Sequence, residues 1–224
     1  MKKPKISILM PLYNTPPSLL RNAIKSHLNQ SQKNFELLIL NDSPNNSALA
    51  QVVSEFDDPR IVYRKNESHL GLAGARNKLI EMARGKYLAV ADHDDVSMPD
   101  RLKLQSQYLD WHPWCGVCSA QRTQVFSNDE KIASHFPTSN RGMKKDIGKI
   151  SHCACMLRKS VLDRHKIIYD DAVFPHEDSK LFRDLAKITC FHAIDKVLVH
   201  WIFHGDNTSI LCGVKYERKQ KEKS

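Results

Sequence analysis

Short apolar runs alternate with segments of helical periodicity through the first half of this 224-residue chain. The expected strands cover residues 5–10, 35–40, 60–64 and 86–91, and the expected helices cover residues 18–28, 48–56 and 72–83. Strands separated by helices of this length are typical of βαβ units. The sequence therefore predicts an α/β fold with a mainly parallel sheet. Ser18 is expected to cap the first helix, and Gly85 to close the third.

Polar loops follow three of the expected strands. They are Tyr13-Asn14, Asn41-Asp42-Ser43 and the run 92–95. Ligands of open parallel sheets bind beyond the carboxyl ends of the strands, so these loops are expected to share one rim. The sequence therefore predicts where the site lies before any motif is considered.

The second half of the chain is less regular and is expected to continue the same domain. Pro99 opens a helix that runs to Trp111. The remaining expectations are strands at 116–126 and 153–157, a polar, basic, mobile loop at 134–149, a helix at 179–186 and a strand-rich segment at 188–201. One domain is therefore expected over residues 1–212, with a basic tail at 213–224.

The chain carries 34 Lys and Arg residues against 25 Asp and Glu, a net charge of +9. This excess favours anionic partners such as nucleotides, nucleic acid or an acidic membrane surface. No apolar run approaches the roughly 20 residues of a membrane-spanning helix, and none near the start resembles a signal peptide, so a cytoplasmic protein is expected. Its six cysteines are then most simply buried thiols. A zinc site formed by Cys115, Cys118, Cys153 and Cys155 is the alternative, but the second pair lacks the usual spacing.

The run Asp92-His93-Asp94-Asp95 directly follows an apolar strand. Alternating carboxylates at a strand end offer the oxygen ligands that Mg²⁺ or Mn²⁺ prefers. The alternative is a solvated turn that caps the next helix.

Asp42 and Arg76 are candidate ligand contacts on the same rim. A carboxylate at position 42 can accept hydrogen bonds from a base edge or a ribose, and the alternative is an Asx-turn. Arg76 lies near a helix start, where phosphate is favoured, although such an arginine is more often a surface residue. The chain has no G-x-G-x-x-G after its first strand and no Walker A motif, which argues against an NAD enzyme or a P-loop NTPase.

Two groups of residues later in the chain are further candidates for the site. Glu177-Asp178 opens a helix and offers either a general base or a pair of carboxylates that satisfies the helix dipole. His200 and His204 follow a strand, and one of them is a candidate for a metal or diphosphate contact.

Together these pieces resemble the family 2 glycosyltransferases with the GT-A fold. The matching segments, in chain order, are 11–14, 41–43, 71–77, 92–95, 98–102, 177–178 and 204–209. The resemblance implies a GT-A-type, Rossmann-like α/β/α sandwich with a mixed, mainly parallel sheet. It also implies a nucleotide-binding half at about 1–97 and an acceptor half at about 98–212.

The resemblance further implies transfer of a sugar, with inversion, from a nucleotide-diphosphate donor to an acceptor hydroxyl. Asp178 matches the catalytic base. Asp94, Asp92 and His204 match the positions around a divalent metal, Mn²⁺ or Mg²⁺. The nucleotide-binding positions would be Pro11, Tyr13, Asn14, Asp42, Arg76, Asp92 and His93.

The expected partners are a UDP-sugar and a glycan or glycolipid acceptor of bacterial lipopolysaccharide or surface-polysaccharide synthesis, without nucleic acid. Asn41 stands where many relatives carry a second Asp. The chain also lacks the Q-x-x-R-W motif of processive synthases, which favours a single addition. The basic tail offers contact with an anionic membrane, or is a frayed, solvated end. The alternatives are a nucleotidyltransferase and a non-catalytic nucleotide-binding module.

Overall fold

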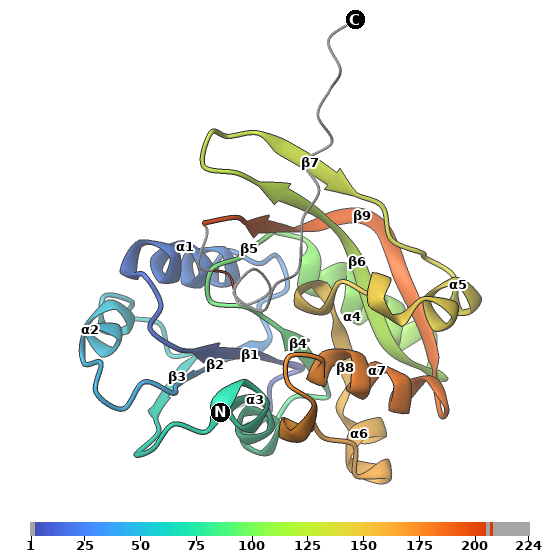
Figure 1. The fold of residues 1–224 in the computed structure, drawn as a ribbon, viewed down its shortest axis with the longest axis horizontal. Coiled ribbons are helices and arrows are strands. Elements are labelled where there is room, and N and C mark those ends of the chain that lie inside the picture. The colour runs from blue at the N-terminus through green and yellow to red at the C-terminus, as the bar shows by residue number, and fades with distance from the viewer. Residues whose placement is uncertain (1–2, 205–206, 208–224) are drawn as a thin grey trace, which may run out of the picture.

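Nine strands form one mixed sheet within residues 3–204 and 207, the part of the chain that the computed structural model describes. They are β1 (Ile6–Leu12), β2 (Phe35–Asn41), β3 (Ile61–Lys65), β4 (Tyr87–Val90), β5 (Val96–Ser97), β6 (Cys115–Val125), β7 (Lys131–Ser134), β8 (Met156–Arg158) and β9 (Cys190–Ile202). Their order is β3-β2-β1-β4-β8-β6-β9-β5, and β7 pairs with β6 (Figure 1). The predicted α/β class and mixed sheet are confirmed.

Helices cover both faces of this sheet (Figure 1). One face packs against α1 (Pro17–Leu28), α2 (Ala48–Ser54) and α4 (Arg101–Trp111). The other packs against α3 (Gly71–Met82), α6 (Lys159–His165) and α7 (Glu177–Ala186). Shorter pieces are α5 (Asn140–Lys145) and the 3₁₀ turns η1 (Ile147–Lys149), η2 (His152–Ala154) and η3 (Asp171–Val173).

The N-terminal part of the sheet is parallel. β1 pairs in parallel with β2 and β4, and β2 pairs in parallel with β3. Every residue of β1, β2 and β4 is buried, because helices cover the sheet on both sides. This burial explains why these strands are near-continuous apolar runs in the sequence. Their carboxyl ends, beyond Leu12, Asn41 and Val90, lie at one edge of the sheet.

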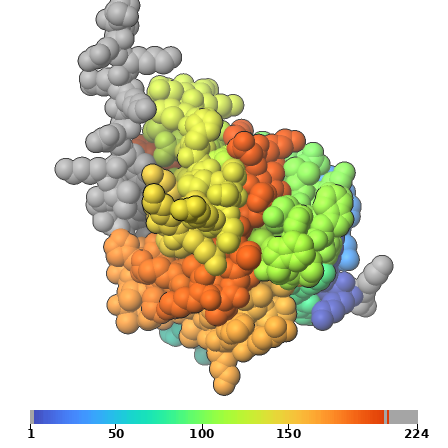
Figure 2. Space-filling view, turned by 90° about the vertical axis from the view of Figure 1, so that its right-hand side faces the viewer, coloured from blue at the N-terminus to red at the C-terminus, as the bar shows by residue number. Residues whose placement is uncertain are grey.

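The C-terminal part of the sheet is mixed, because β5, β7 and β8 run opposite to β4 whereas β6 and β9 run in the same direction as β4. β8 is antiparallel to both β4 and β6, whereas the long strands β6 and β9 pair in parallel. β5 is antiparallel to β9, which brings the end of β9 to the turn that follows β4. Figure 2 shows the outer face of this half, where α5 contacts β9 and η1 contacts α7.

Two local predictions for the second half are wrong. Residues 134–149 are not one loop, because Ser139 accepts a hydrogen bond of 3.2 Å from Gly142 N and starts α5, whose Met143 is buried. Only the end of the strand expected at 153–157 forms, since η2 precedes it and β8 begins at Met156. In both places a short turn of helix interrupts a pattern that periodicity alone assigns to one element.

The expected helix ends also differ. α1 begins at Pro17, so Ser18 is its second residue and not its cap. α3 ends at Met82, the following Ala83 is extended, and Gly85 does not close the helix. Gly85 is instead required for space, because a Cβ there would lie 2.5 Å from Ser7 N and 2.7 Å from Ile6 C.

The described helices include none with the length and apolar character needed to cross a bilayer. The basic tail predicted at 213–224 lies outside the described residues.

Candidate active site

A cavity of about 1060 Å³ opens at the carboxyl edge of β1, β2 and β4. Its walls come from the loops after these strands, the start of α3 and the chain around Phe174. Seven residues that the sequence predicts for the site line this cavity, namely Pro11, Tyr13, Asn14, Asp42, His93, Asp94 and His204. Arg76, Asp92 and Asp178 lie outside the set of described residues that line it.

Asp94 contacts two residues that follow β9, His204 and Asn207, at this cavity. Its Oδ2 lies 2.8 Å from His204 Nε2 and accepts a hydrogen bond of 3.2 Å from Asn207 Nδ2. Burial alone would raise the pKa of Asp94, but the bond with His204 and the nearby His93 outweigh burial and lower the pKa. Asp94 is therefore an anion at neutral pH, as a metal-ligating carboxylate must be.

Strand pairing explains how residues 110 positions apart come together. β5 follows the turn 92–95, which we call the carboxylate turn, and pairs with β9, with Val96 opposite His200. Asp95 Oδ1 also accepts a 3.2 Å hydrogen bond from Ile202 N. The last residues of β9 are thus fixed against the turn, and His204 emerges beside Asp94.

The Asp94 and His204 side chains fit a divalent cation. Their 2.8 Å separation is close to the spacing of two adjacent ligands around one ion, since octahedral bonds of about 2.1 Å place neighbouring ligands about 3 Å apart. A carboxylate and an imidazole suit Mn²⁺, and carboxylates with water suit Mg²⁺.

A second group of ligand atoms, from Asp92, Asp95 and Cys153, lies within 4.8 Å of one another. Burial raises the pKa of the Cys153 thiol, although the thiolate is the form that ligates metal. Burial and the neighbouring charges of Asp94 and Asp92 likewise raise the pKa of Asp95. These shifts disfavour the charged forms that a cation needs, so Asp94 with His204 is the better candidate.

Arg76 is buried outside the described lining of the cavity and connects two predicted parts of the site. Its guanidinium lies 2.8 Å from Glu177 Oε1 and 3.4 Å from Asp92 Oδ1, and it stacks 5.4 Å from the centroid of the Tyr169 ring. Burial alone would lower the pKa of Arg76, but Asp92, Tyr169 and Glu177 outweigh burial and raise it. Arg76 is therefore a buried cation that ties the carboxylate turn to α7.

Asp178 follows Glu177 in the first turn of α7. Its Oδ1 accepts a hydrogen bond of 2.5 Å from Ser179 N, and the side chain is partly exposed. The ion pair of Glu177 with Arg76 fixes this turn relative to Asp92. Asp178 is thus held close to the carboxylate turn without itself lining the cavity.

Asp42 lies at the end of β2 and is almost fully buried. Its Oδ1 accepts hydrogen bonds from Asn66 Nδ2 at 2.7 Å and from Leu70 N at 2.9 Å. Its Oδ2 lies 2.8 Å from His69 Nδ1. The carboxylate therefore organises the loop that leads from β3 to α3.

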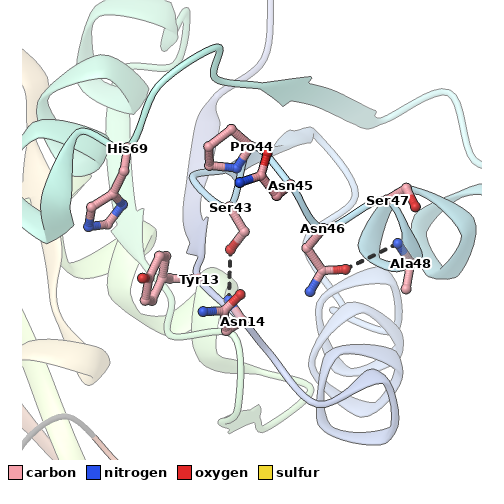
Figure 3. A pocket seen from close by; sticks show the side chains of 9 residues that line it. All are labelled: Tyr13, Asn14, Ser43, Pro44, Asn45, Asn46, Ser47, Ala48 and His69. Atoms are coloured by element: carbon pink, nitrogen blue, oxygen red, sulfur yellow. Dashed lines mark hydrogen bonds between the residues drawn. The ribbon is translucent and has the colours of Figure 1, made fainter.

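A second cavity, of about 610 Å³, adjoins the first (Figure 3). Its walls are Tyr13, Asn14, His69 and the turn 43–48. Asn14 has a left-handed backbone, with φ of 46°, and its N–H donates a 2.8 Å hydrogen bond to Ser43 Oγ. This bond joins the loops after β1 and β2.

Several cavity residues were not predicted from the sequence. They are Leu12, Pro16, His69, Leu70, Gly71, Leu72, Ala75, Asp171 and Phe174. His69 lies in the loop before α3, and the polar composition of that loop suggests only a turn. Asp171 reaches the site because its Oδ1 accepts a 3.1 Å hydrogen bond from Gly74 N, a contact over 97 positions that no local pattern reveals.

The fold is that of the glycosyltransferases with the GT-A architecture. The crystal structure of residues 1–349 of S. aureus TarS in complex with UDP-GlcNAc matches with a TM-score of 0.77 at 18% identity, over 91% of this chain and 60% of that chain. At this identity the likeness concerns the fold alone.

The chain belongs to glycosyl transferase family 2, whose family model matches residues 7–166. It is 41% identical over 112 residues to an uncharacterized glycosyltransferase of Methanocaldococcus jannaschii, a match over 49% of this chain and 39% of the relative. It is 37% identical over 100 residues to the Escherichia coli UDP-Glc:alpha-D-GlcNAc-diphosphoundecaprenol beta-1,3-glucosyltransferase WfgD, over 45% of this chain and 39% of WfgD. The chain thus matches about two fifths of each relative's length.

Proposed function

We propose that the chain transfers a sugar from a UDP-sugar to the hydroxyl of a glycan or glycolipid acceptor, with inversion at the anomeric carbon and with Mn²⁺ or Mg²⁺. The observation that carries this proposal is the single cavity lined by Tyr13, Asp42, Asp94 and His204. An aromatic ring and a carboxylate suit a nucleobase, and a carboxylate with an imidazole suits a metal ion near the diphosphate. UDP-GlcNAc in the TarS structure and UDP-Glc in the name of WfgD support the choice of uridine.

In this proposal each end of the cavity binds one end of the donor nucleotide. Asp42 accepts a hydrogen bond from the base, and the Tyr13 ring packs on the base face. At the other end Asp94 and His204, together with Asp92 next to the cavity, would hold the metal ion. When bound, the ion supplies a Lewis acid that neutralises the charge developing on the diphosphate.

Asp178 acts as the general base. The acceptor oxygen forms a bond to the anomeric carbon while the bond from that carbon to the diphosphate oxygen breaks, and the hydroxyl proton passes to the Asp178 carboxylate. Attack from the face opposite the leaving group inverts the centre. Arg76 and Glu177 hold the Asp178 turn and Asp92 in fixed relation through their buried ion pair.

Residues 1–97 are proposed as the donor half and 98–212 as the acceptor half of one catalytic domain. Acceptors of polysaccharide or lipopolysaccharide synthesis are proposed because the name of WfgD specifies a lipid-linked diphosphate sugar. Such an acceptor would be reached at the cytoplasmic face of a membrane.

Calorimetric titration with UDP, with and without Mn²⁺, tests the proposal. Wild-type protein is expected to bind UDP more tightly with Mn²⁺, and Asp94→Ala is expected to lose that dependence. The matched control is Asp163→Ala, an exposed carboxylate of α6 that pairs with Lys159. Absence of binding to UDP under every metal condition would overturn the proposal, and binding without turnover of any UDP-sugar would favour a non-catalytic module.

A further inference from the structure

The His69 side chain occupies a position with two contacts that suit a planar, nitrogen-containing ring. Its imidazole lies against the Tyr13 ring, with the two centroids 4.5 Å apart and the planes inclined by 33°. Its Nδ1 lies 2.8 Å from Asp42 Oδ2 and 3.1 Å from the Asp42 carbonyl oxygen. Figure 3 shows the His69 and Tyr13 rings next to each other at one side of the cavity.

These two rings also stand between the two cavities at the sheet edge. Tyr13, Asn14 and His69 line both the cavity of about 1060 Å³ and the cavity of about 610 Å³. Movement of the His69 ring away from Tyr13 would therefore join the two volumes at the face of the Tyr13 ring.

The side chains of His69 and Asp42 differ sharply in their exposure to solvent. The His69 side chain is 50% exposed, whereas the Asp42 side chain is 2% exposed. If His69 left, Asp42 would keep its hydrogen bonds from Asn66 Nδ2 and Leu70 N, at 2.7 Å and 2.9 Å. The carboxylate would thus stay oriented, and Oδ2, which then keeps only the longer 3.1 Å contact with Leu70 N among the described residues, would have room to accept a new hydrogen bond. A carboxylate oxygen that loses its nearest donor selects a ligand edge that donates an N–H.

We propose that, in the free protein, the His69 imidazole stands in for the nucleobase of the donor, and that donor binding displaces it. This inference rests on the proposed function. The incoming base presents an N–H to Asp42 Oδ2 and a ring face to Tyr13, the same two contacts that His69 makes. His69 then sets the apparent affinity for the nucleotide, because only the fraction of molecules with the ring displaced can bind.

Titration of wild type, His69→Ala and His135→Ala with UDP and Mn²⁺ tests this inference. His135 is an exposed histidine after β7 and serves as the control. His69→Ala is expected to tighten UDP binding, by about fivefold for a displaced fraction of roughly one in five, since the apparent affinity falls in proportion to that fraction. His135→Ala is expected to match wild type.

A second measurement follows the ring itself. The His69 ring signal in the NMR spectrum, assigned by its loss in His69→Ala, is expected to shift when UDP is added, because the ring leaves Tyr13 and Asp42. UDP binding that is unchanged or weaker in His69→Ala would overturn the displacement and leave the proposed function standing. Absence of UDP binding in both proteins would overturn the proposed function as well.

Discussion

The Arg76 guanidinium lies 2.8 Å from Glu177 Oε1, across 101 positions of sequence. The Arg76 side chain is 8% exposed and that of Glu177 is 5% exposed, so the ion pair is almost completely removed from water. Arg76 extends from α3, and Glu177 opens α7. One buried contact therefore sets the position of the residue that follows Glu177, the proposed base Asp178.

Glu177→Gln is expected to lower the free energy of unfolding by about 3 kcal/mol, because it leaves a buried guanidinium without its nearest counter-charge. Urea denaturation at pH 7 measures the change. Glu81→Gln is the control, since Glu81 pairs with Lys78 on the surface of α3 and exposed pairs contribute about 0–1 kcal/mol. Equal effects of the two substitutions would contradict a structural role for the Arg76–Glu177 pair.

Stability is expected to fall as the pH drops below about 6.5, the ordinary pKa of histidine. Burial, aided by the Arg101 charge, lowers the pKa of His27 to about 3. Below about pH 6.5 His27 is therefore protonated in the unfolded chain but stays neutral in the folded protein, which favours unfolding. At pH 5 the free energy of unfolding is expected to be about 2 kcal/mol lower than at pH 7. Burial also lowers the pKa of His152, which acts in the same direction.

Urea denaturation at pH 7 and pH 5, on wild type and His27→Leu, measures this dependence. Leucine has a similar volume and cannot be protonated, so the variant is expected to lose less stability between the two pH values. An identical loss in both proteins would show that His27 does not contribute.

The strands of the parallel half could be predicted from the sequence because they are buried on both faces. β1, β2 and β4 then appear as apolar runs, and their carboxyl ends locate the rim. Direction and pairing in the second half could not be predicted. β8 has three residues, and the partners of β6 and β9 are distant in the chain, so no local periodicity specifies them.

The residues of the candidate site likewise fall into those that the sequence indicates and those that it does not. Asp42 and Asp94 could be predicted because they end strands of the parallel half. His69 and Asn207 could not, since each contacts one of these carboxylates across a separation in sequence that no local pattern spans. Arg76 illustrates an intermediate case, because the sequence indicates a cation at a helix start but not its burial against Glu177.

Gly85→Ala is expected to destabilise the protein by about 1–3 kcal/mol, since overpacking against fixed backbone forces β1 and β4 apart. The added Cβ would lie 2.5 Å from Ser7 N and 2.7 Å from Ile6 C. Thermal unfolding measures the change, with Gly148→Ala as the control because its Cβ would meet only Asp146 Oδ1, at 3.8 Å. Equal melting temperatures for the two variants would contradict the steric argument.

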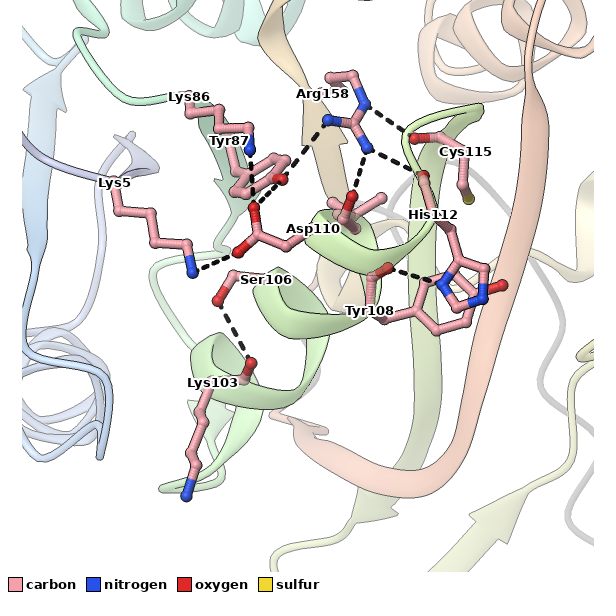
Figure 4. A network of polar contacts seen from close by, with 11 residues as sticks. Lys5, Lys86, Tyr87, Lys103, Ser106, Tyr108, Asp110, His112, Cys115 and Arg158 are labelled. Atoms are coloured by element: carbon pink, nitrogen blue, oxygen red, sulfur yellow. Dashed lines mark hydrogen bonds and ion pairs between the residues drawn. The ribbon is translucent and has the colours of Figure 1, made fainter.

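Asp110→Asn is expected to lower the melting temperature, and less so in 1 M salt. Asp110 of α4 accepts hydrogen bonds from Lys5 at 2.6 Å and from Lys86 and Tyr87 at 2.7 Å each (Figure 4). Burial alone would raise the pKa of Asp110, but these bonds outweigh it and hold the pKa well below its usual range. The side chain is 32% exposed, so salt is expected to screen part of the attraction.

The control for Asp110 is Asp163→Asn, because Asp163 pairs with Lys159 and is 54% exposed. Asp163→Asn is expected to leave the melting temperature almost unchanged. A similar decrease in melting temperature for both variants would mean that the three contacts of Asp110 stabilise the protein no more than one surface ion pair does.

Asp178→Asn separates chemistry from donor binding. The amide keeps the size of the carboxylate and its acceptor for Ser179 N, so the fold of the first turn of α7 is expected to persist. Asp178 does not line the donor cavity, and UDP affinity is therefore expected to stay within about twofold of wild type. An amide cannot take the acceptor proton, and loss of a general base lowers rates by about 10²–10⁴-fold. Release of UDP from UDP-sugars, with water or an added glycan as acceptor, measures this rate.

The control is Asp184→Asn, which is expected to keep full activity. Asp184 lies in the last turns of the same helix and pairs with Lys187 at the surface. Normal turnover by Asp178→Asn would mean that another group accepts the proton of the acceptor hydroxyl. Loss of both UDP binding and turnover would mean that Asp178 contributes to the donor site.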